Sequence, residues 1–323
     1  MKTLTLIIAI LGFVAARSTA APAEEPAELK TAGGIVHGTL LVPESTKPVP
    51  VVLLIAGSGP TDRNGNSIAL PGANNSLKML AEGLAAKGIA SLRFDKRGIA
   101  ESKAAGAAEK DLRFDMYVDD AAAWAEQLKK DHRFSSVTIA GHSEGALIGT
   151  VAAQRGAAVA LVSIAGVSRA ADVVLRGQLA GKLPPDLQEI SERTLTALKS
   201  GKTVDDTPAS LAVLYRPSVQ PYLISWFRYD PIAEIKKVKV PILIVQGTAD
   251  IQVTVDDARA LAAARPDAKL EIIDGMNHVM KMVEADSNKQ IASYSDPALP
   301  IAPRVVDAIA GFVNQKAEGR GQK

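Results

Sequence analysis

The feature that most constrains this chain is a regular alternation of short apolar runs with amphipathic stretches. The run Val49–Ile55 is apolar throughout, as in a strand that is covered on both faces, whereas residues 115–130 place their apolar side chains at helical spacing. Further strands are predicted at 35–42, 89–94, 137–140, 159–164, 241–245 and 269–273. Further helices are predicted at 76–87, 144–155, 255–264 and 304–314. This alternation predicts an α/β fold, a mostly parallel central sheet with helices on both faces.

Residues 168–235 interrupt the alternation. They contain helical stretches and the pair Pro184-Pro185, but no clear strand. Because large apolar residues are sparse there, we expect a helical cap inserted over the carboxyl edge of the sheet; a second small domain with its own core is the alternative. The other expected divisions are a core at 31–167 and 236–315, a flexible lead-in at 21–30 and a polar, frayed tail at 316–323.

The first 20 residues have the pattern of a secretory signal peptide. Lys2 precedes an apolar run over residues 4–16, and small residues follow as far as Ala21. We expect cleavage after Ala20 or after Ala23, and a periplasmic or secreted protein with no stable membrane association after cleavage. An uncleaved anchor is the alternative, but the run is short of the roughly 20 apolar residues that a membrane-spanning helix needs.

Composition excludes several classes of function. With 47% hydrophobic and 22% charged residues, the chain is typical of a globular protein and not of a disordered one. The absence of cysteine excludes disulfides, a thiol nucleophile and thiolate-bound metals. Removing residues 1–20 takes away two of the 37 bases and none of the 35 acids, which leaves 35 against 35. A neutral mature chain attracts nucleic acid and anionic membranes weakly, so we expect neither as a partner.

The strongest local motif is Gly141-His142-Ser143-Glu144-Gly145, which follows a predicted strand and opens a predicted helix. A nucleophile on so tight a turn needs unusual backbone angles. Glycines two residues before and after it remove Cβ atoms that would collide with the neighbouring strand and helix. The serine hydroxyl then stands at a helix N-terminus, where free N–H groups favour an oxyanion. The motif predicts Ser143 as a catalytic nucleophile.

At this motif the chain resembles the α/β-hydrolase superfamily, over about residues 31–315. It is most similar to the exported bacterial branch grouped with serine aminopeptidase-like and prolyl-oligopeptidase-like hydrolases. The segments that support the resemblance, besides GHSEG, are IAGSGPTDRNGN (55–66), RFDKRG (93–98), FRYDP (227–231), GTADIQV (247–253) and GMNHVM (275–280). The superfamily order of nucleophile, acid and histidine implies Ser143, Asp250 and His278 as a catalytic triad.

Asp250 and His278 both follow predicted strands, at the edge where open parallel sheets bind ligands. His278 would act as general base, and Asp250 would hold its imidazole in the right tautomer. A helix-capping role is the alternative for Asp250, while Asp256 and Asp257 are better interpreted as first-turn acids of the next helix. We expect His142 to be structural and the two remaining histidines, His37 and His132, to lie at the surface.

The oxyanion hole needs two N–H donors, and one would be the backbone of Glu144. The superfamily commonly supplies the other from a His-Gly-X loop; this chain has Ala56-Gly57-Ser58 there, which implies the N–H of Ser58. The same loop begins like a dinucleotide fingerprint, but Asp62 stands where the third glycine is required. No G-x-x-x-x-G-K-[ST] sequence occurs, which excludes a P-loop.

Four further residues are candidates for substrate binding. Arg63 would contact substrate or brace its own loop. Trp226, Phe227 and Tyr229 would either line an acyl pocket or fix the cap to the core, and the sequence leaves both interpretations open. Asp95 is expected to pair locally with the arginine two residues later in the turn after strand 89–94.

These residues together predict a serine hydrolase, a carboxylesterase on small or medium esters, that needs neither cofactor nor metal. A peptidase of the aminopeptidase or prolyl type, acting on short peptides, is the first alternative. It would need acids in the cap to hold a free amine, and candidates are Glu189, Glu192, Asp205 and Asp206. A binding protein on a hydrolase scaffold is the second alternative, because fold does not imply function.

Overall fold

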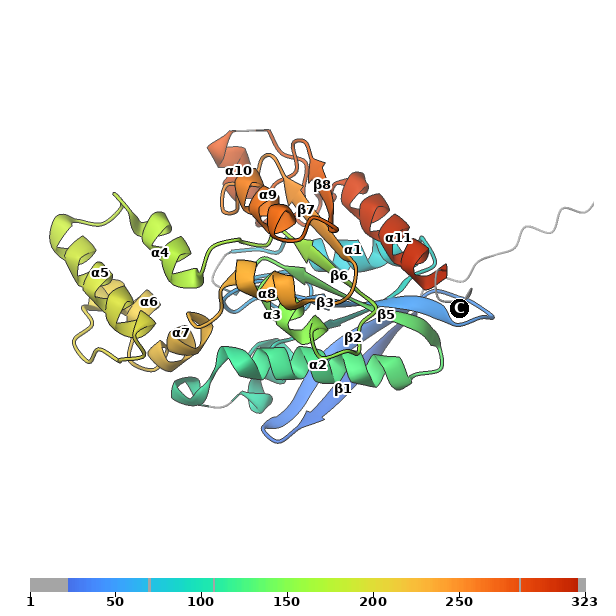
Figure 1. Ribbon diagram of the computed structural model, residues 1–323, viewed down its shortest axis with the longest axis horizontal. Helices are drawn as coiled ribbons and strands as arrows, with labels where there is room; N and C mark the ends of the chain where they lie inside the picture. Colours follow the sequence, from blue (N-terminus) through green and yellow to red (C-terminus); the bar gives the residue numbers. More distant parts are fainter. Residues whose placement is uncertain (1–22, 69–70, 107, 285, 319–323) are drawn as a thin grey trace, which may run out of the picture.

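A computed structural model describes residues 23–318, apart from 69–70, 107 and 285. Its described strands form one eight-stranded sheet in the order β1-β2-β4-β3-β5-β6-β7-β8 (Figure 1). Strands β3 to β8 run parallel, and β1 and β2 are antiparallel additions at one edge. The strands are β1 (Ala23–Thr31), β2 (Gly34–Val42), β3 (Val49–Ile55), β4 (Ala90–Phe94), β5 (Phe134–His142), β6 (Ala160–Ile164), β7 (Ile242–Gly247) and β8 (Lys269–Ile273). The α/β sheet predicted from the alternation is confirmed.

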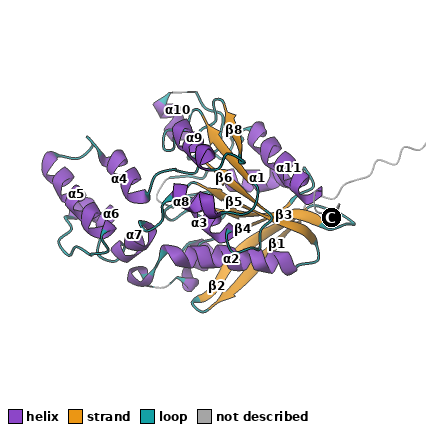
Figure 2. Ribbon diagram, viewed as in Figure 1, coloured by secondary structure: helices purple, strands orange, loops and turns teal. Residues whose placement is uncertain are grey.

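Helices cover both faces of the sheet (Figure 2). One face carries α1 (Ser76–Ala85) and α11 (Pro303–Glu318); the other carries α2 (Phe114–Lys130), α3 (Glu144–Ala153), α8 (Pro231–Lys237) and α9 (Val255–Ala264). Strand β3 shows why its run is apolar throughout. Its side chains alternate between two buried clusters, Leu53 packing with the α2 side and Leu54 with the α1 side. No helix in the described residues is long and apolar enough to cross a membrane.

The insertion forms four helices that lie to one side of the sheet, at the left of Figure 1: α4 (Ala171–Leu179), α5 (Pro185–Lys199), α6 (Ala212–Tyr215) and α7 (Gln220–Trp226). Buried residues of these helices, such as Leu198 and Tyr215, belong to the same apolar cluster as the α2 face of the core. Helix α8 packs against α3 and α9. The projecting cap therefore ends before residue 235, the limit expected from the sequence.

The expected flexible lead-in at residues 21–30 is wrong for its described part, because residues 23–31 form β1. This strand pairs with β2 along its whole length, from Ala23 opposite Val42 to Thr31 opposite Gly34. Acidic side chains of β1 form ion pairs with arginines that are distant in sequence. Glu24, for example, pairs with the buried Arg93 of β4. An isolated Pro/Glu-rich strand has little β propensity, and these partners stabilise it. The predicted signal peptide, residues 1–20, lies outside the described residues.

Helix α1 begins at Ser76, as expected, and Asn75, with a left-handed φ of 54°, precedes it. Two other helices of the core differ from the sequence-based expectation. Helix α11 continues to Glu318, so residues 316–318 are helical and not part of a frayed tail. Helix α10 (Ser287–Ser293) was not predicted, because its seven residues show no apolar periodicity. Three short 3-10 turns complete the structure, at Ala100–Ala105, Glu109–Asp111 and Ala209–Leu211.

Candidate active site

Ser143 lies on the turn between β5 and α3 with φ 56° and ψ −121°, a backbone conformation that residues with a Cβ rarely adopt. Its N–H donates to the carbonyl of Ile164 on the neighbouring strand β6 at 2.9 Å. The strained turn is thus held from the side by the sheet. A non-glycine residue kept in such a conformation is typical of a functional site.

The reason given for the two glycines of the motif is confirmed. A Cβ on Gly141 would lie 1.9 Å from the carbonyl oxygen of Gly145, and a Cβ on Gly145 would lie 2.4 Å from the carbonyl oxygen of Ile55. Both contacts are with backbone atoms, which cannot yield without moving β3 or α3. Glycine at both positions is therefore a steric condition for the turn that presents Ser143.

Asp250 and His278 are joined by a hydrogen bond of 2.8 Å between Oδ2 and Nδ1. The other carboxylate oxygen of Asp250 accepts from the backbone N–H of Gln252 at 2.8 Å and of Val253 at 2.9 Å. Burial raises the pKa of Asp250, but the adjacent His278 and these donors outweigh burial and hold the pKa below its ordinary value. The carboxylate is thus kept ionised and fixed against the imidazole, which leaves Nε2 of His278 for another partner.

His142, expected to be structural with its side chain directed elsewhere, lies at the site itself. Its ring centre is 4.7 Å from that of His278, and its Nε2 lies 2.7 Å from the carbonyl oxygen of His278. A carbonyl only accepts, so Nε2 of His142 carries the proton. Burial, together with the neighbouring His278, lowers the pKa of His142 to about 4. A neutral His142 therefore positions the backbone of His278.

Ser143 and His278 open onto one cavity of about 150 Å³. Its lining also includes Ser58 and the pair Gln252 and Tyr294, whose side chains are joined by a 2.7 Å hydrogen bond. The other lining residues are Gly57, Thr61, Gly65, Ser67, Asn74, Ser76, His142 and Val279. Drug-sized ligands generally occupy pockets of about 300–1,000 Å³, so this one fits a small group.

The two predicted oxyanion donors belong to separate segments of the chain that both lie beside Ser143. Glu144 is the first residue of α3, where a backbone N–H has no partner within the helix. Across the turn, a Cβ on Gly57 would come within 3.2 Å of the Cβ of Ser143, so the loop carrying Ser58 is in contact with the serine. The structure therefore brings the loop of Ser58 next to Ser143 and Glu144, and the binding of an oxyanion by the two N–H groups stays a prediction.

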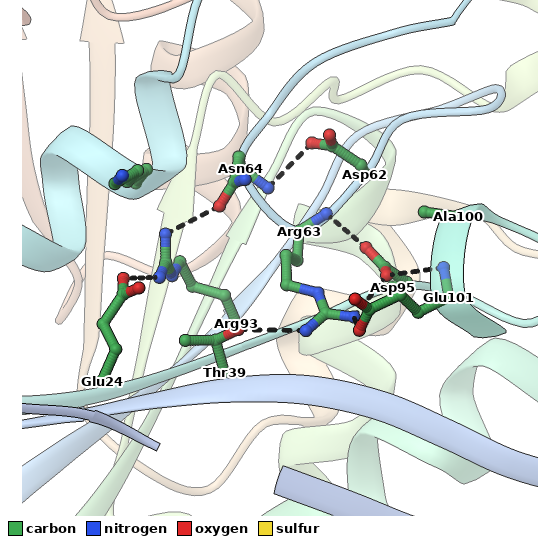
Figure 3. A pocket seen from close by; sticks show the side chains of 10 residues that line it. Glu24, Thr39, Asp62, Arg63, Asn64, Arg93, Asp95, Ala100 and Glu101 are labelled. Carbon is green, nitrogen blue, oxygen red and sulfur yellow. Dashed lines mark hydrogen bonds and ion pairs between the residues drawn. The ribbon is translucent and has the colours of Figure 1, made fainter. Parts of the chain in front are cut away.

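Arg63 does not reach this cavity and braces its own loop. Its guanidinium pairs with Asp95 at 2.6 Å and Glu101 at 2.5 Å, and donates to Thr39 at 3.0 Å. Figure 3 shows these residues around a separate polar pocket of about 270 Å³. The expected local pairing of Asp95 with Arg97 is also wrong, since Asp95 is occupied by Arg63.

The aromatic residues of 226–229 fix the cap to the core, the second of the two interpretations. Trp226 stacks on Phe114 of α2 with ring centres 6.1 Å apart, and the Tyr229 hydroxyl donates to Asp115 at 2.6 Å. Phe227 is 1% exposed. Among the described residues that line the Ser143 cavity, none comes from the cap. Trp226, Phe227 and Tyr229 are therefore not placed to bind substrate.

Four residues near the site were missed from the sequence. Lys96, in the turn after β4, is buried against Glu144 at 2.8 Å. Tyr222 of α7 also bonds to Glu144. Lys96 belongs to the segment RFDKRG (93–98), but a lysine at a strand end is usually exposed. Nothing in its position along the sequence indicates a contact with Glu144. Gln252 and Tyr294 lie in a loop and beside an unpredicted helix, and so carried no signal.

Comparisons with known proteins identify relatives of this chain. A family model described as serine aminopeptidase, S33, matches residues 73–284. Esterase EstD of Thermotoga maritima is 30% identical over 281 residues, which cover 85% of this chain; the chain spans 65% of that protein's length.

Two solved structures share the fold. Est1E of Butyrivibrio proteoclasticus, solved with ferulic acid bound, aligns with a TM-score of 0.62 at 20% identity, over 90% of this chain and 98% of its own. The alpha/beta hydrolase GrgF of a Penicillium species aligns with a TM-score of 0.53 at 17% identity, over 79% of this chain and 91% of its own.

Proposed function

Since this chain belongs to the family described as serine aminopeptidase, S33, and has the α/β-hydrolase fold, we propose that it is a serine hydrolase of carboxylic esters of small or medium size. Ser143 is the nucleophile, His278 the general base and Asp250 the residue that orients the imidazole. The observation that carries the proposal is the 2.8 Å bond between Asp250 and His278 beside a serine held on a strained turn in the same cavity.

The proposed reaction is acyl transfer through the serine. Nε2 of His278 takes the hydroxyl proton as Oγ of Ser143 attacks the ester carbonyl. The N–H groups of Ser58 and Glu144 bind the oxyanion, and the imidazolium gives its proton to the departing alcohol. A water molecule, deprotonated by His278, then attacks the acyl-enzyme and releases the carboxylic acid and free Ser143. Every proton moves through His278, so the cycle uses only these side chains and water.

The lining of the cavity favours an ester over a peptide with a free amine. An aminopeptidase site needs a carboxylate to bind the substrate's ammonium group, because a buried charge without a partner is costly. None of the described lining residues is an aspartate or a glutamate. Of the cap acids considered, Glu192 pairs with Arg176 at 2.9 Å on the far cap helices. The name of the relative EstD supports the same choice.

We also propose that the protein is exported from the cytoplasm. A mature enzyme that begins after residue 20 would act in the periplasm or outside the cell, on ester substrates that reach it there. Its formal charge balance of 35 bases and 35 acids gives it no general attraction to nucleic acid or anionic lipid.

A fluorophosphonate probe tests the nucleophile directly. We expect one adduct per chain, on Ser143, with no adduct in Ser143→Ala or in protein denatured before treatment. Ser143→Ala should also lower kcat on p-nitrophenyl acetate by about 10⁴-fold or more, since triad serines act as part of a unit. A folded Ser143→Ala variant with esterase activity near that of the wild type would contradict the proposal.

A further inference from the structure

Lys96 is a buried cation that the proposed reaction does not yet use. Its side chain is 2% exposed, in the turn that follows β4. The ammonium group donates to the carbonyl oxygen of Gly57 at 2.7 Å and to Oε2 of Glu144 at 2.8 Å. It also lies 5.0 Å from the ring centre of Tyr117, at cation–π distance. One lysine thus connects the two segments that flank Ser143.

Its contact with Gly57 acts on the peptide unit that supplies an oxyanion donor. The carbonyl of Gly57 and the N–H of Ser58 belong to the same planar peptide, and in a trans peptide they point in opposite directions. A cation that holds the carbonyl from one side therefore aims the N–H toward the other. Donation to the carbonyl also polarises the peptide, which makes its N–H a stronger donor.

Its contact with Glu144 acts on the residue that supplies the second donor. The backbone N–H of Glu144 is the other proposed oxyanion donor, and the side chain of the same residue is held by Lys96 and by the hydroxyl of Tyr222. Burial, together with Glu144, raises the pKa of Tyr222 well above its ordinary value, so its hydroxyl remains a donor. Tyr222 lies on α7 and extends the network into the cap.

The end of β4 holds the same loop at two further points (Figure 3). Arg93 donates to the side chain of Asn64 at 2.8 Å, and Asp95 accepts from the backbone N–H of Arg63 at 2.7 Å. With Lys96 on Gly57, three residues from one short segment fix the loop over residues 57–64. Lys96 holds the end of the loop that lies against Ser143.

We propose that Lys96 is a positioning residue that aims and polarises both oxyanion donors, the N–H groups of Ser58 and Glu144, through its bonds to Gly57 and to the Glu144 side chain. The inference rests on the proposed function, because it assigns a role within that reaction. A purely structural ion pair is the competing account. Buried ion pairs replaced by apolar residues of similar size often leave stability unchanged, so the two accounts predict different kinetics.

The test replaces the whole network with apolar side chains in Lys96→Met/Glu144→Leu/Tyr222→Phe. All backbone N–H groups remain, and no buried charge is left without a partner. We expect a melting temperature near that of the wild type, an unchanged KM for p-nitrophenyl acetate and a kcat lower by about 10- to 100-fold. This loss is below the 10²–10³-fold typical of removing a donor outright, because the donors remain and only their alignment and strength change.

Glu144→Gln separates the two contacts of Lys96. It leaves Lys96 in contact with the Gly57 carbonyl but removes its buried counter-charge, so stability should fall clearly, while kcat should fall less than in the triple variant because the Gly57 peptide is still held. The matched control is Arg97→Met/Asp120→Leu, which removes the neighbouring buried pair joined at 2.5 Å. Among the described residues, neither member of that pair has a hydrogen bond or ion pair with residues 57–64, so kcat should be unchanged.

Two measurements report specifically on the hydrogen bonds that the two N–H groups make to the oxyanion. Sulfur accepts hydrogen bonds poorly, so the preference of the wild type for p-nitrophenyl acetate over its thiono analogue should shrink in the triple variant by about the factor lost in kcat. The amide proton of Ser58 should also shift upfield in that variant, which is measurable by NMR without turnover. A triple variant with wild-type kcat and an unmoved Ser58 amide would overturn the inference. The proposed function is judged separately, on Ser143→Ala.

Discussion

His142 and His278 lie with their rings 4.7 Å apart, yet they have different hydrogen-bond partners. Nδ1 of His278 is bonded to the carboxylate of Asp250, whereas Nε2 of His142 lies against the carbonyl oxygen of His278. Burial, together with the neighbouring His278, lowers the pKa of His142 to about 4. A neutral His142 therefore holds the backbone of His278 in place.

The lowered pKa of His142 predicts a pH-dependent stability. The pKa of His142 is about 4 in the folded protein and about 6.5 when unfolded, so the unfolded state binds more protons between these values. The free energy of unfolding should therefore decrease as the pH falls below 6.5, by about 2 kcal/mol at pH 5 from this group. Urea unfolding at pH 7 and pH 5 measures the change.

The control is His142→Gln, which can still donate to the carbonyl of His278 but does not titrate. It should lose about 2 kcal/mol less than the wild type over the same interval, because all carboxyl groups are shared by the two proteins. Equal losses in the two proteins would show that His142 titrates normally in the folded state.

Individual residues also show how much of the site could be predicted from the sequence. That Ser143, Asp250 and His278 lie close together could be predicted because each stands at a strand end, and the sheet aligns such ends in space. Arg63 and the aromatic residues near 226 could not be placed. Their partners, Asp95 and Phe114, are far away in sequence, and either role was compatible with the same local pattern.

At the scale of elements, the edge of the sheet shows the limit of periodicity. The strands β3 to β7 can be recognised by their largely apolar runs, because almost all of their residues are buried. Strand β1 has one buried residue, Leu29, so its sequence shows no apolar run and predicts a flexible segment. What makes it a strand is its pairing with β2 and the ion pair of Glu24 with Arg93, neither of which its own residues reveal.

The segment after α10 is an element with a predicted role in specificity. Tyr294 closes one wall of the Ser143 cavity through its bond to Gln252, and burial raises the pKa of its hydroxyl to about 12, so it donates or accepts as a neutral group. The cavity of about 150 Å³ should accept acetyl and exclude long acyl chains.

Tyr294→Ala should open this wall and move the optimum of kcat/KM toward longer p-nitrophenyl esters, with a gain on octanoate of about tenfold relative to acetate. One methylene more or less in a hydrophobic pocket is worth about 1–3 kcal/mol, which sets the scale of this gain. The matched control is Ile291→Ala on α10, which is 66% exposed and should leave the chain-length profile unchanged. An unchanged profile in Tyr294→Ala would place the acyl group elsewhere.

At the scale of the whole molecule, the first strand among the described residues lies close to the expected cleavage site. Strand β1 starts at Ala23, so cleavage after Ala20 leaves it whole, whereas cleavage after Ala23 removes its first residue. The partner of that residue is Val42 on β2. Retaining the pair favours the earlier site.

Export can be tested on the mature chain. Expressed with its own first 20 residues in a bacterial host, the protein should be recovered from the periplasm or the medium with Ala21 at its N-terminus. Intact mass and N-terminal sequencing measure this. A chain that keeps Met1 and stays with the membrane fraction would instead indicate an uncleaved anchor.

If Ser143, His278 and Asp250 hydrolyse carboxylic esters, a comparison of kcat/KM on matched substrates will show a preference for the ester. p-Nitrophenyl acetate is compared with alanyl- and prolyl-p-nitroanilides, with Ser143→Ala as the blank. After subtraction of the blank, we expect kcat/KM for the ester to exceed kcat/KM for either anilide by at least 10³-fold. All hydrolysis of the ester above the blank should depend on Ser143. Strong Ser143-dependent cleavage of either anilide would contradict the esterase assignment and identify the protein as a peptidase.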